Sequence, residues 1–224
     1  MGSVALGGYT ARRRLLIMAN VTLVNYGLGN IQAFAHIYQR LNISVEIAET
    51  AGQIEKAEKL ILPGVGAFDW AMKRLNDSGL RDPLDQAVLQ KRVPILGVCV
   101  GMQMMALCSE EGTLPGLGWI DADVVRFDPV NFSGIPLPHM GWNDVQPMAV
   151  DSLFSDINAP RYYFLHSYCV VPRSPDNILA TAHYGGSFTA AVRKNHIFGT
   201  QFHPEKSHQW GISLLKNFAE LKTC

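Results

Sequence analysis

The chain has 224 residues, and its formal net charge at pH 7 is zero because 19 Lys and Arg side chains balance 19 Asp and Glu side chains. This balance argues against a dedicated nucleic-acid-binding protein, and a hydrophobic content of 48% with 17% charged residues excludes a disordered chain. A chain of this length forms one domain, or at most two small ones, with a core large enough to need no metal or disulfide.

Residues 1–19 are predicted to be an appendage that precedes the domain. Residues 1–45 contain no Asp or Glu and include a run of three arginines. The apolar stretch 15–24 is too short to span a bilayer, which needs about 20 residues. A secretory signal is disfavoured because its cleavage would damage the first core strand, whereas an organelle transit peptide and a start at Met18 stay open. We expect the domain itself to cover residues 20–224.

The first half of the domain alternates short apolar runs with helical patterns. The runs predicted as strands are 21–25, 43–48, 59–62 and 93–98. Helices are predicted from the Asn30 cap through Leu41, over 67–75 and 80–90, and from about Val100 onward. Because strands that alternate with helices form parallel sheets with right-handed crossovers, we predict a largely parallel central sheet flanked by helices.

From Trp119 to Phe202 the pattern changes to short β-like runs broken by Pro, Gly and Asn. The main strand candidates are 124–127, 162–171, 178–183, 188–193 and 197–202. The chain ends in a predicted amphipathic helix over about 207–221, whose apolar face comprises Ile212, Leu215, Phe218 and Ala219. We predict one α/β domain in which the second half extends the sheet with antiparallel strands.

The sharpest chemical pattern is G-V-C-V-G at 97–101, which lies between an apolar strand and a helix. It is the thiol version of the nucleophile elbow, in which glycines permit a strained turn that exposes Cys99. The amino terminus of the helix then favours the reactive thiolate. Taken alone, the pattern also fits a small buried cysteine. The four cysteines form no C-x-x-C pair, so we expect a reducing compartment, and Cys108 and Cys169 are predicted to be small buried residues.

Two further motifs strengthen the interpretation of Cys99 as a nucleophile. His203 and Glu205 follow the last predicted strand, and residues two apart in an extended backbone face the same side, so the carboxylate is expected to orient the imidazole. The loop P-G-V-G at 63–66 offers backbone N–H groups. Together with the N–H of Val100, they are predicted to form an oxyanion hole from Gly64, Val65 and Gly66.

These motifs resemble those of the class I (triad) glutamine amidotransferases, which implies a flavodoxin-like α/β fold. Five motifs narrow the resemblance to the glutaminase subunits of imidazole glycerol phosphate synthase, which act in histidine biosynthesis. They are Y-G-L-G-N at 26–30, P-G-V-G-A-F at 63–68, P-H-M-G-W-N at 138–143, F-L-H-S-Y at 164–168 and Q-F-H-P-E-K-S at 201–207. The match covers the chain from about Val21 to its end, and P-H-M-G-W-N is the most discriminating motif.

The resemblance implies a glutaminase that uses no cofactor and no metal. Cys99 attacks the side-chain amide of L-glutamine, His203 protonates the departing ammonia, and water activated by His203 hydrolyses the γ-glutamyl thioester, with Glu205 as the third member of the triad. The substrate-binding residues that it implies are Gly66, Gln103, Glu111, Ser167 and Tyr168. Gln103 lies one helical turn after Cys99, whereas Glu111 also fits a solvated loop charge.

The resemblance also implies a heterodimer in which ammonia passes to a separate (β/α)₈-barrel cyclase subunit. That subunit makes imidazole glycerol phosphate and an aminoimidazole carboxamide ribotide. Trp142, Tyr163 and Lys206 occupy positions that face this partner in the family, although Trp142 also fits ordinary core packing. A cytoplasmic protein with no nucleic-acid or membrane partner is expected.

Three alternatives stay open from the sequence. One is a glutaminase that serves another synthase, such as anthranilate synthase, although those relatives lack P-H-M-G-W-N. Another is a Cys-His hydrolase or peptidase on a related fold, against which Gln103 and Glu205 argue. The third is a scaffold that only binds its partner, and the intact set Cys99, His203 and Glu205 argues against it.

Overall fold

The computed structural model of the chain describes residues 20–127, 135–148 and 152–222. The predicted appendage, residues 1–19, lies outside the described residues. Within the described part, no helix is long and apolar enough to cross a membrane.

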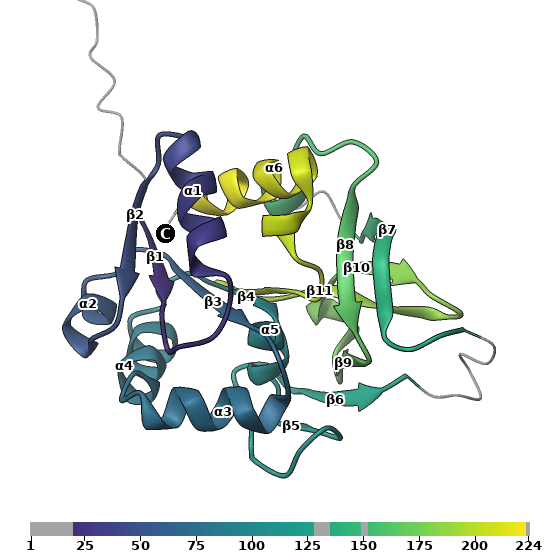
Figure 1. Ribbon diagram of the computed structural model, residues 1–224, viewed down its shortest axis with the longest axis horizontal. Coiled ribbons are helices and arrows are strands. Elements are labelled where there is room, and N and C mark those ends of the chain that lie inside the picture. Colours follow the sequence, from purple (N-terminus) through teal and green to yellow (C-terminus); the bar gives the residue numbers. More distant parts are fainter. Residues whose placement is uncertain (1–19, 128–134, 149–151, 223–224) are drawn as a thin grey trace, which may run out of the picture.

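A nine-stranded sheet runs through the whole molecule (Figure 1). In spatial order its strands are β2 (Ser44–Ala48), β1 (Asn20–Val24), β3 (Leu60–Gly64), β4 (Ile95–Cys99), β12 (Ile197–Thr200), β11 (Ser187–Lys194), β10 (Ile178–His183), β7 (His139–Pro147) and β8 (Arg161–His166). In this order, neighbouring strands from β2 to β12 run parallel to each other. Neighbouring strands from β12 to β8 run antiparallel. The predicted parallel sheet with an antiparallel extension is therefore confirmed.

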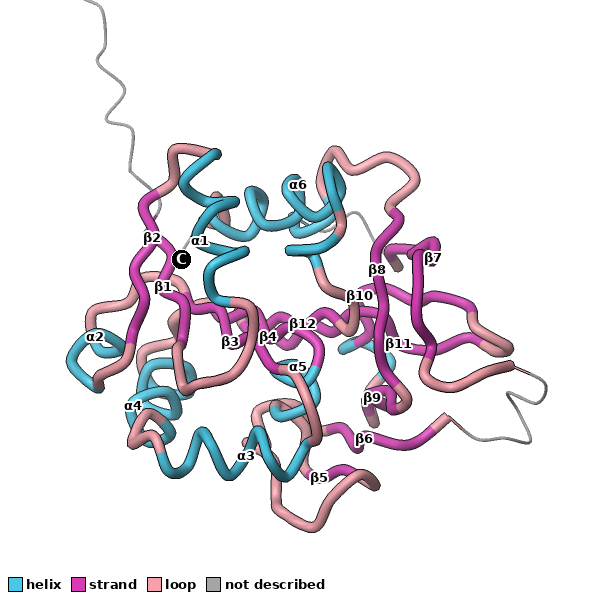
Figure 2. The backbone as a smooth tube through the Cα atoms, in the orientation of Figure 1, coloured by secondary structure: helices cyan, strands magenta, loops and turns pink. Residues whose placement is uncertain are grey.

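Helices cover both faces of the parallel half, as Figures 1 and 2 show. On one side lie α1 (Ile31–Arg40) and α6 (His208–Ala219), joined by the Tyr38 hydroxyl, which donates to the carbonyl oxygen of Leu215 at 3.1 Å. The other side carries α3 (Phe68–Asp77), α4 (Arg81–Asp85) and α5 (Val100–Met104). Asn30 caps α1 as predicted, because its side chain accepts from the backbone N–H of Ala33.

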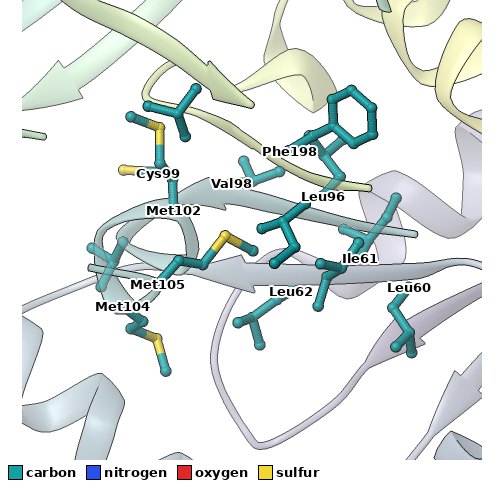
Figure 3. Packing of buried hydrophobic residues seen from close by; sticks show 14 of the residues in the cluster. Leu60, Ile61, Leu62, Leu96, Val98, Cys99, Met102, Met104, Met105 and Phe198 are labelled. Atoms are coloured by element: carbon teal, nitrogen blue, oxygen red, sulfur yellow. The ribbon is translucent and has the colours of Figure 1, made fainter. Parts of the chain in front are cut away.

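The core lies around β3 and β4, whose residues are all buried because helices pack on both faces. Figure 3 shows this packing, in which the strands contact side chains of α5 and β12; the labelled residues include Leu60, Leu62, Leu96, Met102, Met105 and Phe198. Full burial of one such side chain stabilises the folded state by about 1.5–3 kcal/mol. Because β3 and β4 are held firmly in the core, the turn that follows β4 is held in place as well.

A smaller three-stranded sheet joins β5 (Cys108–Ser109), β6 (Ala122–Arg126) and β9 (Tyr168–Pro172). The predicted single strand over 162–171 is wrong, because Ser167 separates β8 in the large sheet from β9 in the small one. The prediction that Cys108 is buried is also wrong. Cys108 is exposed because its strand, β5, pairs only with β6. Its thiol lies 3.3 Å from Asp123 Oδ1. Cys169 is buried, as expected.

Other differences concern short or irregular elements. The predicted helix over 80–90 is α4 followed by a π-helical segment, Gln86–Gln90. The sequence did not indicate β7, α2 (Ala51–Glu55) or β5, and short 3₁₀ turns occur at Ser152–Phe154, Pro175–Asn177 and Pro204–Lys206. On α6, Leu214 is buried and Ile212 is only half-buried, so the apolar face is rotated from the predicted one.

Candidate active site

Cys99 lies where β4 ends and α5 begins, and its backbone has φ 54° and ψ −113°, which L-residues rarely adopt. Two glycines let the neighbouring backbone come close enough for this turn. A Cβ atom on Gly101 would collide with the carbonyl oxygen of Leu62, and one on Gly64 would collide with the backbone nitrogen of Gly101. The strained strand-to-helix turn that the sequence predicts is confirmed.

His203 and Glu205 meet, but through a turn and not through an extended strand. The turn Pro204–Lys206 brings His203 Nδ1 to 2.9 Å from Glu205 Oε1. The Ser207 hydroxyl fixes the same turn, because it donates to the carbonyl oxygen of His203 at 2.6 Å and accepts from the N–H of Tyr163 at 3.0 Å. The predicted pairing is confirmed, whereas the predicted extended geometry is wrong because Pro204 starts the turn.

The charge of His203 follows from its two partners. Burial by itself lowers the pKa of this imidazole, but hydrogen bonds to Cys99 and Glu205, together with the negative charges of both, raise it to about 10. His203 is therefore positively charged at neutral pH when the sulfur of Cys99 is ionised. Since Nδ1 is bonded to Glu205, the ring nitrogen left for Cys99 is Nε2.

Cys99 and His203 open into a cavity of about 330 Å³. Most of the residues that the sequence singles out for catalysis or substrate binding line it, and they are Val65, Gly66, Cys99, Val100, Gln103, Glu111, Ser167, Tyr168 and His203. Pro138, Leu165, His166 and Lys206 complete the lining. Gly64 and Glu205 lie behind this wall, Gly64 against the start of α5 and Glu205 against His203.

A larger hollow of about 700 Å³ lies elsewhere, beside Pro94 and His196, which precede β4 and β12. It therefore lies at the amino ends of these two parallel strands, whereas Cys99 is at the carboxyl end of β4. None of the predicted site residues lines it. In open parallel sheets, ligands bind at the carboxyl ends of the strands, and the chemistry of this chain is at that end.

The loop 64–66 forms one wall of the cavity next to Cys99. Gly66 has φ 86°, which favours glycine, and Val65 is exposed. The loop is anchored on its inner side, because the buried Tyr26 hydroxyl donates to the carbonyl oxygen of Pro63 at 2.8 Å. Val100 supplies the first backbone amide of α5, directly after Cys99. The loop and Val100 thus line the same cavity as Cys99 from two elements.

Gln103 and Glu111 both line the cavity, and hydrogen bonds to different parts of the chain hold them in place. Gln103 is buried, and its Nε2 donates to the carbonyl oxygen of Tyr168 at 3.2 Å and to Gln201 Oε1 at 3.1 Å. Glu111 Oε2 accepts from the N–H of Phe68 at 2.9 Å, at the start of α3. Its Oε1 makes no bond within the described part of the chain. Glu111 is therefore a fixed carboxylate at the cavity wall and not a freely solvated loop charge.

Two buried histidines support the cavity wall, and the sequence motifs did not assign them a role. His166 Nδ1 lies 2.8 Å from the carbonyl oxygen of Tyr168, and His166 Nε2 lies 3.0 Å from His139 Nδ1. Since a carbonyl only accepts, each ring carries its proton on Nδ1, and Asn143 Nδ2 donates to His139 Nε2 at 3.3 Å. Burial lowers the pKa of His139 to about 4 and that of His166 to about 3, so both rings are neutral at pH 7.

The predicted partner-facing residues lie together next to His203. Trp142 and Tyr163 are paired across β7 and β8, and Lys206 Nζ lies 5.8 Å from the centre of the Tyr163 ring. The Trp142 ring stacks on His208 at 5.1 Å and is 37% exposed, so ordinary core packing does not describe it. Lys206 contacts the Tyr163 ring and also lines the cavity.

This arrangement is suited to acyl transfer through a thiol. The strained turn aims Cys99 at the cavity, a charged imidazole stabilises its thiolate, and Glu205 orients that imidazole. Val65, Gly66 and Val100 line the same cavity, and backbone N–H groups are the kind of donor that binds an oxyanion. Gln103 and Glu111 add an amide and a carboxylate to the cavity lining, which suits a small polar substrate with a positively charged group.

Comparison with known proteins agrees with this chemistry. The sequence profile of the family "Glutamine amidotransferase class-I" matches residues 22–221. The chain is 53% identical over 203 residues to the imidazole glycerol phosphate synthase subunit HisH of Bdellovibrio bacteriovorus, covering 90% of this chain and 100% of that protein. It is 50% identical to HisH 2 of Pseudomonas aeruginosa, covering 90% of this chain and 99% of that protein.

Solved structures share the fold at lower sequence identity. The structure of PurLQS from Thermotoga maritima matches with a TM-score of 0.65 at 16% identity, covering 90% of this chain and 98% of that chain. A crystal structure titled glutamine amidotransferase matches with a TM-score of 0.63 at 21% identity, covering 88% of this chain and 98% of that chain. These structural likenesses support the predicted amidotransferase-like α/β fold.

Proposed function

Because the chain belongs to the class-I glutamine amidotransferases, and within them to the HisH subunits of imidazole glycerol phosphate synthase, we propose that its cavity hydrolyses L-glutamine to glutamate and ammonia through a thioester on Cys99. The chain is thus the glutaminase subunit of a histidine-biosynthesis enzyme. The observation that carries the assignment of residues is the meeting of Cys99, on its strained turn, with the His203–Glu205 pair at one cavity.

In the proposed reaction the Cys99 thiolate attacks the side-chain amide carbon of glutamine. The resulting oxyanion accepts hydrogen bonds from the amide of Val100 and from the loop 64–66. Charged His203 gives its proton to the amide nitrogen, the C–N bond breaks, and ammonia leaves. Neutral His203 then takes a proton from water, whose oxygen attacks the thioester, and glutamate departs as the thiolate is restored.

The cavity wall supplies contacts for the amino-acid end of the substrate. Both N–H bonds of the Gln103 amide are used inside the protein, so its Oε1 is the atom available to accept from a substrate N–H. Glu111 Oε1 is an acceptor for the α-ammonium group. Gly66 and the backbone of Ser167 and Tyr168 complete the pocket.

The finer proposal for the partner is a (β/α)₈-barrel cyclase that receives the ammonia. An apolar patch lies at the mouth of the cavity and comprises the exposed Val65, Met140, Trp142 and Leu165 and the half-buried Tyr163. Val65 and Leu165 line the cavity, Met140 pairs with Leu165 in register, and Met140 is 65% exposed. Such a patch is typical of a protein interface. With Lys206 it forms the proposed cyclase-binding surface, called the mouth patch below.

We further propose that residues 20–224 form the amidotransferase domain and that residues 1–19 are an appendage to it. In support, the family match covers residues 22–221. A cytoplasmic location is proposed because the cytosol keeps thiols such as Cys99 reduced.

The test compares two cysteine variants in the complex with the cyclase. Cys99→Ala is expected to abolish synthesis from glutamine and to leave synthesis from added ammonia intact, because only the nucleophile is removed. Cys108→Ala is the matched control, since that thiol is exposed and lies outside the cavity. Glutamine-dependent turnover that persists in Cys99→Ala would overturn the assignment. Loss of both activities would point to a failure of assembly, which gel filtration of the complex detects.

A further inference from the structure

A buried amide that the mechanism above does not use lies against the reacting sulfur. Gln201 follows β12 and has no exposed surface, and its backbone N–H donates to the carbonyl oxygen of Ala190 at 2.8 Å. Its side-chain Nε2 lies 3.8 Å from Cys99 Sγ, and its Oε1 accepts from Gln103 Nε2 at 3.1 Å. One end of this amide therefore contacts the nucleophile and the other contacts a residue of the substrate pocket.

The carbonyl group of Tyr168 determines which way the side-chain amides of Gln103 and Gln201 are turned. The carbonyl oxygen of Tyr168 can only accept, so Gln103 must present its NH₂ group to it. The second hydrogen of that NH₂ group goes to Gln201, which must therefore present its oxygen to Gln103 and its NH₂ group to the sulfur. A flipped Gln201 would place its NH₂ group against the NH₂ group of Gln103 and leave both unsatisfied in a buried site.

The contacts of the sulfur differ in which charge state they favour. The carbonyl oxygen of Leu165 lies 3.9 Å from Sγ, and since it can only accept, it favours the neutral thiol. A donated N–H favours the thiolate. His203 supplies one such donor but gives its proton away during the reaction, whereas an amide N–H keeps its hydrogen throughout.

We infer that Gln201 is a further catalytic residue, whose amide N–H stabilises the Cys99 thiolate both as the attacking nucleophile and as the leaving group of the thioester. This inference rests on the proposed function for the identity of the reaction. When the thioester forms, sulfur loses its negative charge and the hydrogen bond weakens. When water attacks the thioester, the returning charge strengthens the bond again, so the amide favours release of glutamate. No proton or electron is transferred to Gln201 in either step.

The first test measures the thiol directly in the full-length chain. Alkylation of Cys99 by iodoacetamide is followed by peptide mass spectrometry from pH 5 to 10, which separates Cys99 from the exposed Cys108. Gln201→Met keeps the volume and removes the donor, and the midpoint for alkylation is expected to rise by about one pH unit, because the charged sulfur loses a hydrogen bond that the neutral thiol needs less. Tyr162→Phe is the control, because it removes a buried hydroxyl that has no partner among the described residues.

The second test uses the complex with the cyclase and glutamine as substrate. Gln201→Met is expected to lower kcat about tenfold or more, because the lost donor acts on the sulfur in both steps. KM is expected to change less than about threefold, because Gln103 loses its bond to Gln201 but keeps its bond to the carbonyl oxygen of Tyr168. Gln201→Glu retains the acceptor for Gln103 but replaces the donor to sulfur by a carboxylate oxygen, and it is expected to slow alkylation at least as much. It also serves as the second variant if Gln201→Met fails to fold.

The outcomes separate this inference from the proposed function. An unchanged alkylation midpoint and unchanged kcat in a folded Gln201 variant overturn the inference, even if the wild-type complex hydrolyses glutamine. A shifted midpoint in a chain that hydrolyses no glutamine with its cyclase supports the role of Gln201 on the thiol and overturns the proposed function instead. A large rise in KM with an unchanged midpoint assigns Gln201 to support of Gln103 alone and also overturns the inference.

Discussion

At Cys99 the demands of chemistry and of backbone conformation oppose each other. A non-glycine residue at φ 54° and ψ −113° lowers the stability of the fold by about 1–3 kcal/mol. The close backbone packing at Gly64 and Gly101 must offset this loss. The gain is that the sulfur lies at the start of a helix and beside His203. The strain is therefore part of the candidate site and not a general property of the sheet.

This strain predicts an unusual order of stability between two inactive variants. Cys99→Gly and Cys99→Ala both remove the sulfur, but only glycine adopts this backbone conformation without strain. We expect Cys99→Gly to have the higher free energy of unfolding by about 1 kcal/mol, although alanine is the better residue by about 0.5–1 kcal/mol in an ordinary helix or strand. Urea denaturation of the two variants measures the difference. A more stable Cys99→Ala would show that the turn is not strained.

The neutral pair His139 and His166 predicts a loss of stability in mild acid. Their folded pKa values, about 4 and about 3, lie below the ordinary value near 6.5, so the unfolded chain binds more protons. Their contribution to stability is therefore complete above pH 6.5 and is lost as the pH falls toward 4. For His139 alone the loss between pH 7 and pH 5 is about 2 kcal/mol.

The measurement is the free energy of unfolding in urea at pH 7 and pH 5 for the wild-type chain and for His139→Gln. The glutamine keeps an N–H donor for His166 but does not titrate. We expect the variant to lose less stability than the wild-type chain over this pH interval. Equal losses in both proteins would mean that His139 is not held neutral by burial.

At the scale of elements, the parallel half of the sheet could be predicted because its strands are short, apolar and bounded by Gly, Pro or Asn. The break at Ser167 could not, since both flanking runs are β-like and only the tertiary structure places them in different sheets. β7 was missed because its exposed Met140 and Trp142 break the expected alternation. Propensity does not show which exposed apolar residues belong to a binding surface.

Some residues of the candidate site could likewise be predicted from the sequence, and others could not. Cys99, His203 and Glu205 could be predicted because each belongs to a short motif at or just after the end of a strand. Gln201 and the two buried histidines could not be assigned a role, since their bonds join positions far apart in the chain. Gln201 contacts a sulfur 102 residues away, and His139 contacts a ring 27 residues away.

One loop depends on a clamp from the first turn of α3. Asp69 accepts from the N–H of Thr113 at 2.9 Å and from the N–H of Leu114 at 3.0 Å, and these bonds lower the pKa of its carboxyl group. A Cβ atom on Gly112 would collide with the same carboxylate. Because Glu111 immediately precedes these residues, the clamp fixes the carboxylate proposed to bind the substrate ammonium group.

We expect Asp69→Ala to raise KM for glutamine about tenfold with a smaller change in kcat, because the substrate contact is loosened and the triad is not touched. The measurement is glutamine-dependent synthesis in the complex with the cyclase. Lys73→Ala is the matched control, since it removes an exposed ion pair with Asp77 on the same helix, and such pairs contribute little. A fall in kcat alone would instead place the effect of Asp69 on the triad side of the cavity.

For the whole molecule, the decisive feature is the position of the mouth patch relative to the cavity. Met140 and Trp142 lie on one face of β7, and their partners Leu165 and Tyr163 lie on the same face of β8. The strand β8 also reaches His203, whose N–H donates to the carbonyl oxygen of Tyr163 at 2.9 Å. A partner seated on this patch would therefore cover the exit from the candidate site.

This geometry predicts that a charge in the mouth patch uncouples the two activities of the complex. Met140→Glu would bury an unpaired carboxylate in the proposed interface, so we expect the affinity for the cyclase to fall about 30-fold or more, which corresponds to at least ~2 kcal/mol. Binding is measured by titration of the cyclase. Val171→Glu is the control, because Val171 is a comparably exposed apolar residue at 48% but lies on β9 in the other sheet. Glutamine-dependent synthesis should fall at limiting cyclase, whereas synthesis from ammonia by the cyclase should not. If Met140→Glu binds the cyclase as tightly as Val171→Glu does, the cyclase does not dock on the mouth patch. Ammonia would then have to leave the cavity at a place other than this patch.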